Sequence, residues 1–180
     1  MRLLTRRERE ALRKRFCPAR IRILFVGEAP PVSGRFFYSA NSGLYRAMRD
    51  VFKAADPRIN EANFLNQFQA SGCYLTDLCP TPVDHLDTES RRRARVAGEM
   101  LLSEKLIRLR PDKIATVLRA IVGHVANAAA RANWRGRIIE LPYPGRWHRH
   151  REEFVRALEP TLRELFRSHR SNDTPRRLPR

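Results

Sequence analysis

The sequence predicts an α/β fold, namely a three-layer sandwich in which a central four-stranded parallel sheet is flanked by helices. Two observations lead to this prediction. Four short apolar runs have the composition of buried strands, and the segments between them carry apolar residues at helical spacing. When strands and helices alternate in this way, each helix crosses the sheet and returns the chain to a parallel strand.

The predicted strands are short and mostly apolar. Residues 21–26 form the clearest one, because β-branched and aromatic side chains make a continuous run that Gly27 closes. Three later segments have the same character, at residues 73–77, 113–118 and 137–141. In open α/β sheets, ligands bind beyond the carboxyl ends of the strands, so the segments after these runs are where a site is expected.

Six helices are predicted between and around these strands. Residues 5–16 form the first, because Thr5 can cap its start and Pro18 follows its end. Residues 42–55 form the second, with an apolar stripe along one side. The other predicted helices cover residues 60–68, residues 89–108 with Thr88 or Ser90 as the cap, residues 121–132 and residues 152–166.

We expect one domain over residues 1–167 and a basic, disordered tail over residues 168–180. A chain of 180 residues is long enough to bury a core without disulfides or metals. The tail mixes arginines with prolines and has no apolar periodicity. No apolar run is long enough for a membrane span, and the start of the sequence alternates basic and acidic residues without an apolar region. We therefore expect a cytoplasmic protein.

The strongest feature of the composition is its positive charge. Lys and Arg number 36 against 19 Asp and Glu, which gives a net charge of +17, and 32 of the 36 cations are arginine. Such an excess repels itself unless an anionic partner is usual, and arginine pairs well with phosphate. A bias in the base composition of the coding DNA would explain the high ratio of arginine to lysine, but it would not explain the net charge. We therefore expect a nucleic-acid partner, a monomer, and a place at the bacterial nucleoid.

Metal and cofactor sites are not expected. The three cysteines lack the spacing of a zinc or iron–sulfur site, and we expect them to be reduced. Asp84, His85 and Asp87 are of metal-ligating types, but loop triads of this kind are common. We predict no metal there, and we expect His85 and His124 to be structural.

The segment after the first strand contains the first candidate site. Glu28 stands at the mouth of the sheet, and Phe36, Phe37 and Tyr38 follow in a loop, where large rings are costly to expose. A carboxylate beside a platform of rings is suited to hold a flat heterocycle. Alternatively, Glu28 caps a helix or faces solvent, and the rings belong to the core.

Two basic segments are candidates for DNA contact. After the fourth strand, a Pro-x-Pro-Gly turn leads into Arg146, Trp147, His148, Arg149 and His150. Arginine holds phosphates, tryptophan stacks on bases or wedges between them, and histidine can stabilise a developing anion. The alternative is a basic loop that leads into a helix.

The other basic segment is the start of the helix at residues 89–108, which carries Arg91, Arg92, Arg93 and Arg95. The helix dipole also favours phosphate at this end. A solvated helix face, with glutamates of the same helix as partners, is the alternative.

The chain resembles the uracil-DNA glycosylase superfamily over residues 20 to about 165. Its Gly-Glu-Ala-Pro-Pro at residues 27–31 and Gly-Arg-Phe-Phe at residues 34–37 are similar to the first motif of the thermophile-type branch. The remaining similarities are weaker and occur in the family's order. Thr-Asp-Leu-Cys-Pro at residues 76–80 corresponds to the Thr-Asn that ends the family's second strand, and residues 110–118 resemble its proline-led third strand. Leu-Pro-Tyr-Pro at residues 141–144 stands in place of the family's His-Pro-Ser-Pro.

The resemblance implies a monofunctional DNA glycosylase that flips uracil out of DNA, hydrolyses its N-glycosidic bond and leaves an abasic site. By position, Glu28 would orient water and balance positive charge at the sugar, and Phe37 would stack on the base. Asp77 would read the base edge, with Asn41 as a neighbouring donor. Backbone N–H groups from Ala29 onward and a histidine would stabilise the leaving base. DNA that contains uracil is the implied partner, and no cofactor is needed.

Three departures from the family pattern qualify this picture. The four iron–sulfur cysteines are absent, so no cluster is predicted. Leu141 occupies the position of the second-motif histidine, so His148, or else His150, would have to reach the pocket. Asp77 replaces the base-reading asparagine, and an ionised carboxylate only accepts hydrogen bonds. Either burial beside Glu28 raises the pKa of Asp77, or the base carries an amino group.

Two other functions stay open at this point. A DNA-binding or abasic-site-binding protein without catalysis is one, and the missing second-motif histidine and the basic surface favour it. A glycosylase for another deaminated base is the other. An RNA-binding regulator is a weaker possibility, because the strands lack the exposed rings that such domains use. In the enzyme, Arg146 or Trp147 would fill the gap that the flipped nucleotide leaves.

Overall fold

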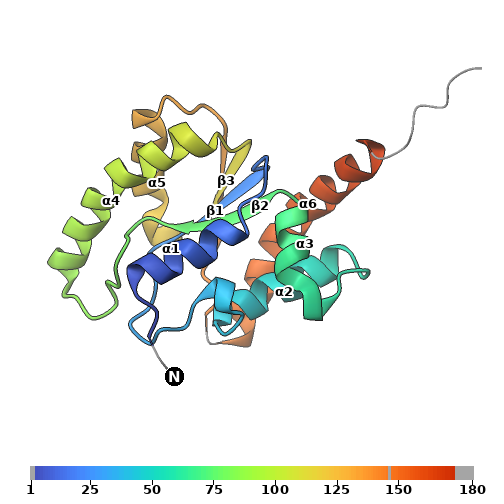
Figure 1. Cartoon of the computed structure of the whole chain (residues 1–180), viewed down its shortest axis with the longest axis horizontal. Helices are drawn as coiled ribbons and strands as arrows, with labels where there is room; N and C mark the ends of the chain where they lie inside the picture. Colours follow the sequence, from blue (N-terminus) through green and yellow to red (C-terminus); the bar gives the residue numbers. More distant parts are fainter. Residues whose placement is uncertain (1–2, 146, 173–180) are drawn as a thin grey trace, which may run out of the picture.

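The computed structural model describes residues 3–145 and 147–172 of the chain. A four-stranded parallel sheet with the order β2-β1-β3-β4 lies between helices, as Figure 1 shows. The strands are β1 (Ile23–Gly27), β2 (Cys73–Asp77), β3 (Lys113–Thr116) and β4 (Arg137–Glu140). The helices are α1 (Arg6–Arg15), α2 (Gly43–Ala55), α3 (Phe64–Ala70), α4 (Thr88–Leu109), α5 (Val122–Arg131) and α6 (His148–Asn172). The predicted fold class is confirmed.

The register of the sheet brings the carboxyl ends of its strands to one edge. Gly27 at the end of β1 pairs with Asp77 at the end of β2, and Val26 pairs with Thr116 at the end of β3. Thr116 in turn pairs with Glu140 at the end of β4. The loops after the four strands therefore begin side by side, which is the arrangement that a shared site requires.

The helices form two layers around the sheet (Figure 1). On one side, α2, α3 and α6 share an aromatic cluster with β1. The Phe25 and Phe68 rings are 5.7 Å apart, and those of Phe52 and Phe166 are 5.5 Å apart. On the other side, α4 packs on α5, where the buried Glu99 carboxylate lies 2.6 Å from the His124 ring. His124 thus has a structural role, as expected.

One predicted helix cap is confirmed by the structure and another is wrong. Thr5 caps α1 and forms a reciprocal capping box with Glu8, and Ser42 caps α2. At α4 the cap is Asp87, whose side chain accepts from the Ser90 backbone N–H. The predicted Thr88 or Ser90 cap is therefore wrong by one or more positions, because Asp87 offers the stronger acceptor.

The last helix is longer than predicted. Helix α6 begins at His148 and continues to Asn172, so residues 168–172 of the expected tail are helical. A contact from a distant segment supports its end, because Arg22 donates to the Ser168 hydroxyl at 2.7 Å and to the Leu165 carbonyl at 3.5 Å. The rest of the expected tail, residues 173–180, lies outside the described residues. Within residues 3–145 and 147–172, no helix has the length and hydrophobicity that crossing a bilayer requires.

Candidate active site

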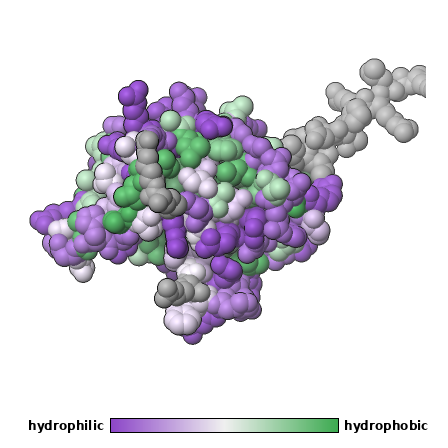
Figure 2. All heavy atoms as spheres, turned by 60° about the horizontal axis from the view of Figure 1, so that its bottom comes forward, coloured by the Kyte–Doolittle hydropathy of each residue, from purple (hydrophilic) through white to green (hydrophobic). Residues whose placement is uncertain are grey.

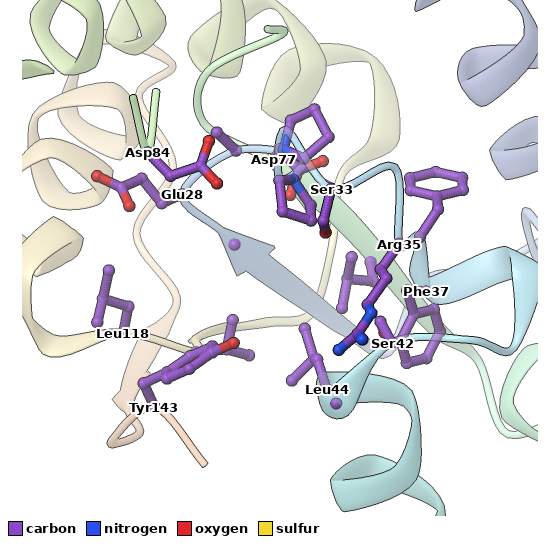
Figure 3. Close-up of a pocket in the computed structure, with 18 of the residues that line it drawn as sticks. Glu28, Ser33, Arg35, Phe37, Ser42, Leu44, Asp77, Asp84, Leu118 and Tyr143 are labelled. Atoms are coloured by element: carbon purple, nitrogen blue, oxygen red, sulfur yellow. The ribbon is translucent and has the colours of Figure 1, made fainter. Parts of the chain in front are cut away.

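A cavity of about 690 Å³ lies at the carboxyl edge of the sheet, and Figure 3 shows many of its lining side chains. Segments after all four strands contribute to the lining, which is where the fold class predicted a site. They are parts of residues 27–37 after β1, of 77–84 after β2, of 117–118 after β3 and of 143–145 after β4. The starts of α2, α4 and α6 add Ser42, Arg46, Arg91 and Arg151.

Glu28 lies in the wall of this cavity and is held by two arginines from the first turns of α4. Its side chain is 11% exposed. Arg91 binds the carboxylate in a bidentate manner, with Nε 2.7 Å from Oε1 and Nη2 donating to Oε2. Arg95 donates to Oε1 from Nε at 2.7 Å. Two of the arginines predicted to hold phosphate therefore bind the candidate catalytic carboxylate.

The arginines determine the charge state of Glu28. Burial by itself would raise its pKa, but the hydrogen bonds from Arg91 and Arg95 outweigh burial and hold the pKa below its ordinary value. Glu28 is therefore ionised at neutral pH. A carboxylate has about four acceptor positions. Among the described residues, both arginines donate to Oε1 and only Arg91 donates to Oε2, so Oε2 has an acceptor position left for a water molecule.

The other two arginines of this segment make local contacts. Arg92 pairs with Glu89 one turn earlier, at 2.7 Å, and Arg93 donates to the Ser90 hydroxyl at 3.3 Å. Both side chains are exposed. The pairing of Arg92 matches the alternative of a solvated helix face, while phosphate contact by Arg92 and Arg93 stays a prediction.

Asp77 lines the cavity beside Glu28, and its charge is matched by an arginine from α1. Arg13 donates from Nη2 to Oδ2 at 2.6 Å, and both side chains are buried. Lys105 contacts the backbone carbonyl of Asp77 at 3.2 Å. The carboxylate also depends on Gly27, because a Cβ there would lie 2.8 Å from Oδ1.

The pKa of Asp77 reflects opposing causes. Burial raises it above its ordinary value, while the positive charges of Arg13 and Lys105 act in the opposite direction. For Arg13, burial lowers the pKa, but the charges of Asp77 and Glu10 outweigh it and raise the pKa. The two side chains thus form a buried ion pair in the wall of the cavity. Arg13 precedes Asp77 by 64 residues, so no local pattern in the sequence could have indicated this pairing.

The Phe37 ring belongs both to the core and to the cavity wall. It contacts the rings of Tyr38 at 5.0 Å and of Phe68 at 5.2 Å, and it also lines the cavity (Figure 3). The core interpretation therefore applies to Phe37, and stacking on a base stays a prediction. Ala29 lines the cavity as well. Asn41 does not belong to the lining, and its Oδ1 accepts from the Phe36 backbone N–H at 2.7 Å, which supports the loop.

The structure does not bring His148 to the cavity. Its side chain is 87% exposed at the start of α6, and Nδ1 lies 3.3 Å from Glu152 one turn later. The first turn of α6 directs the ring toward solvent, so the catalytic role expected of His148 stays a prediction that this placement does not support. His150 packs against Gly145 at the edge of the lining, where a Cβ would be 2.7 Å from Nδ1. In the described part of the chain, no histidine lines the cavity.

The structure describes two of the three other residues of this segment that were expected to contact DNA. Trp147 and Arg149 are exposed at the start of α6. Arg146 lies outside the described residues.

Figure 2 shows one face of the molecule, on which hydrophilic side chains surround a smaller apolar area, as the high net charge leads one to expect.

Sequence reasoning missed several side chains that line the cavity, among them Arg35, Arg46, Tyr143 and Arg151. Arg35 and Tyr143 lie inside segments that resemble family motifs, so the signal was present. Arg46 and Arg151 lie on helices, where an arginine resembles any other solvated residue. Among the residues described, no ion pair involves Arg35, Arg46 or Arg151.

The comparison with protein families decides the family. A model of the uracil DNA glycosylase superfamily matches residues 14–166, a range that contains all four strands and the cavity segments. The chain belongs to the uracil-DNA glycosylase superfamily. The resemblance noted in the sequence is thus confirmed, and membership implies a DNA glycosylase with a DNA substrate. A search of curated proteins found no match.

Two further findings concern the position of Arg13 relative to the matched range and the metal-ligating residue types of the described chain. The matched range begins at residue 14, so Arg13, which holds Asp77, comes just before it. Among the residues that the structure describes, no group of three or more histidine, cysteine or acidic side chains could hold a metal ion.

Proposed function

We propose that the protein hydrolyses the N-glycosidic bond of uracil in DNA and leaves an abasic site. One observation carries the proposal. An ionised carboxylate, Glu28, is fixed by two arginines in the wall of a cavity that the largely buried Phe37 ring and Asp77 carboxylate also line. Superfamily membership supports the reaction class, and the arrangement supplies a negative charge, a flat apolar wall and a polar edge in one place.

The cavity provides space for a nucleotide that has left the duplex. Its volume of about 690 Å³ lies within the range typical of small-molecule sites. A base inside a stack cannot be reached, so the target nucleotide must be flipped out before reaction. The net charge of +17 attracts the DNA backbone, and it opposes self-association, so we also propose a monomer at the DNA of a bacterial cytoplasm.

Glu28 performs two tasks in this mechanism. Its remaining acceptor position on Oε2 orients a water molecule, and its negative charge stabilises the positive charge that develops at the sugar C1′ carbon. The water oxygen bonds to C1′ while the bond from C1′ to N1 of the base breaks. The electron pair of that bond leaves on the base, and the proton that water loses returns to the base through solvent.

Asp77 determines how the base edge is read. Because Arg13 neutralises one oxygen of the carboxylate, Oδ1 stays an acceptor and pairs with the N3–H of uracil. The same geometry favours a second candidate, a base whose edge carries an amino group, because such a group donates to a carboxylate without opposing a carbonyl. Oligonucleotides with uracil, cytosine or adenine at one position separate these candidates by which free base is released.

The experiment that tests the proposal uses a duplex with a single uracil, alkaline cleavage of abasic sites, and detection of the free base. We expect release by the unaltered protein, and Glu28→Gln should slow release at least about 100-fold. Glu104→Gln is the matched control, because Glu104 is an exposed glutamate of α4 away from the cavity. No release from any duplex at enzyme excess, with DNA still bound, would instead identify a binding protein without catalysis.

A further inference from the structure

The departing base needs hydrogen-bond donors, and the cavity lining offers arginine side chains and hydroxyl groups. When the glycosidic bond breaks, negative charge develops on the base, and a donor aimed at its carbonyl oxygen lowers the barrier. No histidine lines the cavity in the part of the chain that the structure describes. Among the arginines of the lining, Arg91 is bound to Glu28, whereas Arg35, Arg46 and Arg151 make no ion pair with a described residue and are suited to the phosphates of the flipped nucleotide. The hydroxyl donors are Ser33, Ser42 and Tyr143.

Two of these hydroxyls are poorly placed. Ser42 caps α2, where its oxygen accepts from the Tyr45 backbone N–H, so its orientation serves the helix. Ser33 is exposed on the loop between β1 and α2. Tyr143 differs from both, because it follows β4 at the edge of the sheet where the strand ends meet. Its hydroxyl end points toward the middle of the cavity, between Leu118 and Leu44 (Figure 3).

The backbone around Tyr143 is firmly held, although the ring is not covered. Leu141 is fully buried and donates its N–H to the Thr116 carbonyl at 3.0 Å, which fixes the segment to β3. Pro142 and Pro144 are buried on either side of Tyr143. The Tyr143 side chain nevertheless remains 52% exposed. A large ring left open on a rigid turn at the mouth of a cavity is placed to contact a ligand.

We propose that Tyr143 is a catalytic residue whose hydroxyl donates a hydrogen bond to the carbonyl oxygen of the departing base. This inference rests on the proposed glycosylase function. The phenol keeps its proton, so the bonds that form and break are those of the hydrolysis itself. Its donated hydrogen bond strengthens as electron density from the broken C1′–N1 bond spreads onto the carbonyl oxygen. Among the described residues, the Tyr143 hydroxyl makes no hydrogen bond that would compete with this role.

Comparing two leaving groups tests the role directly. Tyr143→Phe removes only the hydroxyl, and release is measured in single turnovers from duplexes that contain uracil or 5-fluorouracil. The fluorinated base is the more acidic leaving group and needs less stabilisation. We expect the substitution to slow uracil release by roughly 100-fold, the scale for loss of one such donor, and 5-fluorouracil release by less than about 10-fold. Thr81→Val, an exposed hydroxyl in the loop after β2, should change neither rate.

The outcomes separate this inference from the function on which it rests. Equal slowing of both bases, or no slowing, with release by the unaltered protein intact, would overturn the donor role and leave the glycosylase function standing. Release of neither base by the unaltered protein would overturn both. Thermal melting of Tyr143→Phe shows that the variant is folded, and an unchanged affinity for uracil DNA shows that the ring still contacts its ligand.

Discussion

Replacing Arg13 by methionine removes the cation that neutralises Asp77, and we expect a large loss of stability. The Arg13 side chain is 4% exposed and that of Asp77 is 10% exposed, and their contact is 2.6 Å long. Breaking such a buried pair from one side costs about 3–5 kcal/mol, because the remaining charge is left without a partner. Lys105 stays near the carboxylate, so we expect the lower end, about 3 kcal/mol. In a chain of this length, that lowers the melting temperature by roughly 10 °C.

The loss should depend on pH with a definite sign. Burial raises the pKa of Asp77, and removal of Arg13 raises it further. Lowering the pH then protonates the orphaned carboxylate, and its desolvation penalty is relieved. The difference in unfolding free energy between Arg13→Met and the unaltered protein should therefore be larger at about pH 8 than at about pH 5.

Urea denaturation followed by far-UV circular dichroism measures these free energies. Arg7→Met is the matched control, because Arg7 is exposed on the same helix, and it should stay within about 0.5 kcal/mol of the unaltered protein. The double variant Arg13→Met with Asp77→Asn should recover much of the loss, since it leaves no buried charge. A loss below about 1 kcal/mol in Arg13→Met, or no recovery in the double variant, would refute the reasoning.

Two further predictions concern the arginines of the cavity. Arg91→Gln removes the bidentate partner of Glu28, so the pKa of Glu28 should rise. The rate of uracil release should then begin to fall at a higher pH on acidification than it does in the unaltered protein. If the pH at which the rate falls does not shift, Glu28 does not titrate in that step. Arg151→Gln should weaken DNA binding and reduce the slope of log affinity against log salt concentration by about 1, as expected for one lost phosphate contact. The control is Arg156→Gln, which lies farther along α6 and outside the cavity and should leave this slope unchanged.

Under the proposed function, Arg13 also affects which base the site recognises. A carboxylate in the position of an asparagine loses the ability to donate, and its pairing with Arg13 stabilises the ionised form. The consequence for specificity lies in a residue of the first helix rather than in the segments that form the cavity. Comparison of base preference between the unaltered protein and Asp77→Asn is therefore the natural companion to the stability measurements.

The sequence by itself determined the elements and the edge of the sheet at which the site lies. The run that became β1, the Thr5 cap and the apolar stripe of α2 rest on interactions within a few residues, which a sequence displays directly. Because ligand sites follow strand ends in this fold class, Glu28 and Asp77 could be placed at that edge before any coordinates were considered.

Only the tertiary structure decided which charges meet. Glu28 lies 63 residues before Arg91, and Asp77 lies 64 residues after Arg13, yet each pair is in direct contact. Arg91 therefore holds a carboxylate, and His148 faces solvent while Tyr143 reaches the cavity. Long side chains such as arginine bind whichever acceptor the packing of distant segments brings within reach, and that packing depends on the whole core rather than on neighbouring residues.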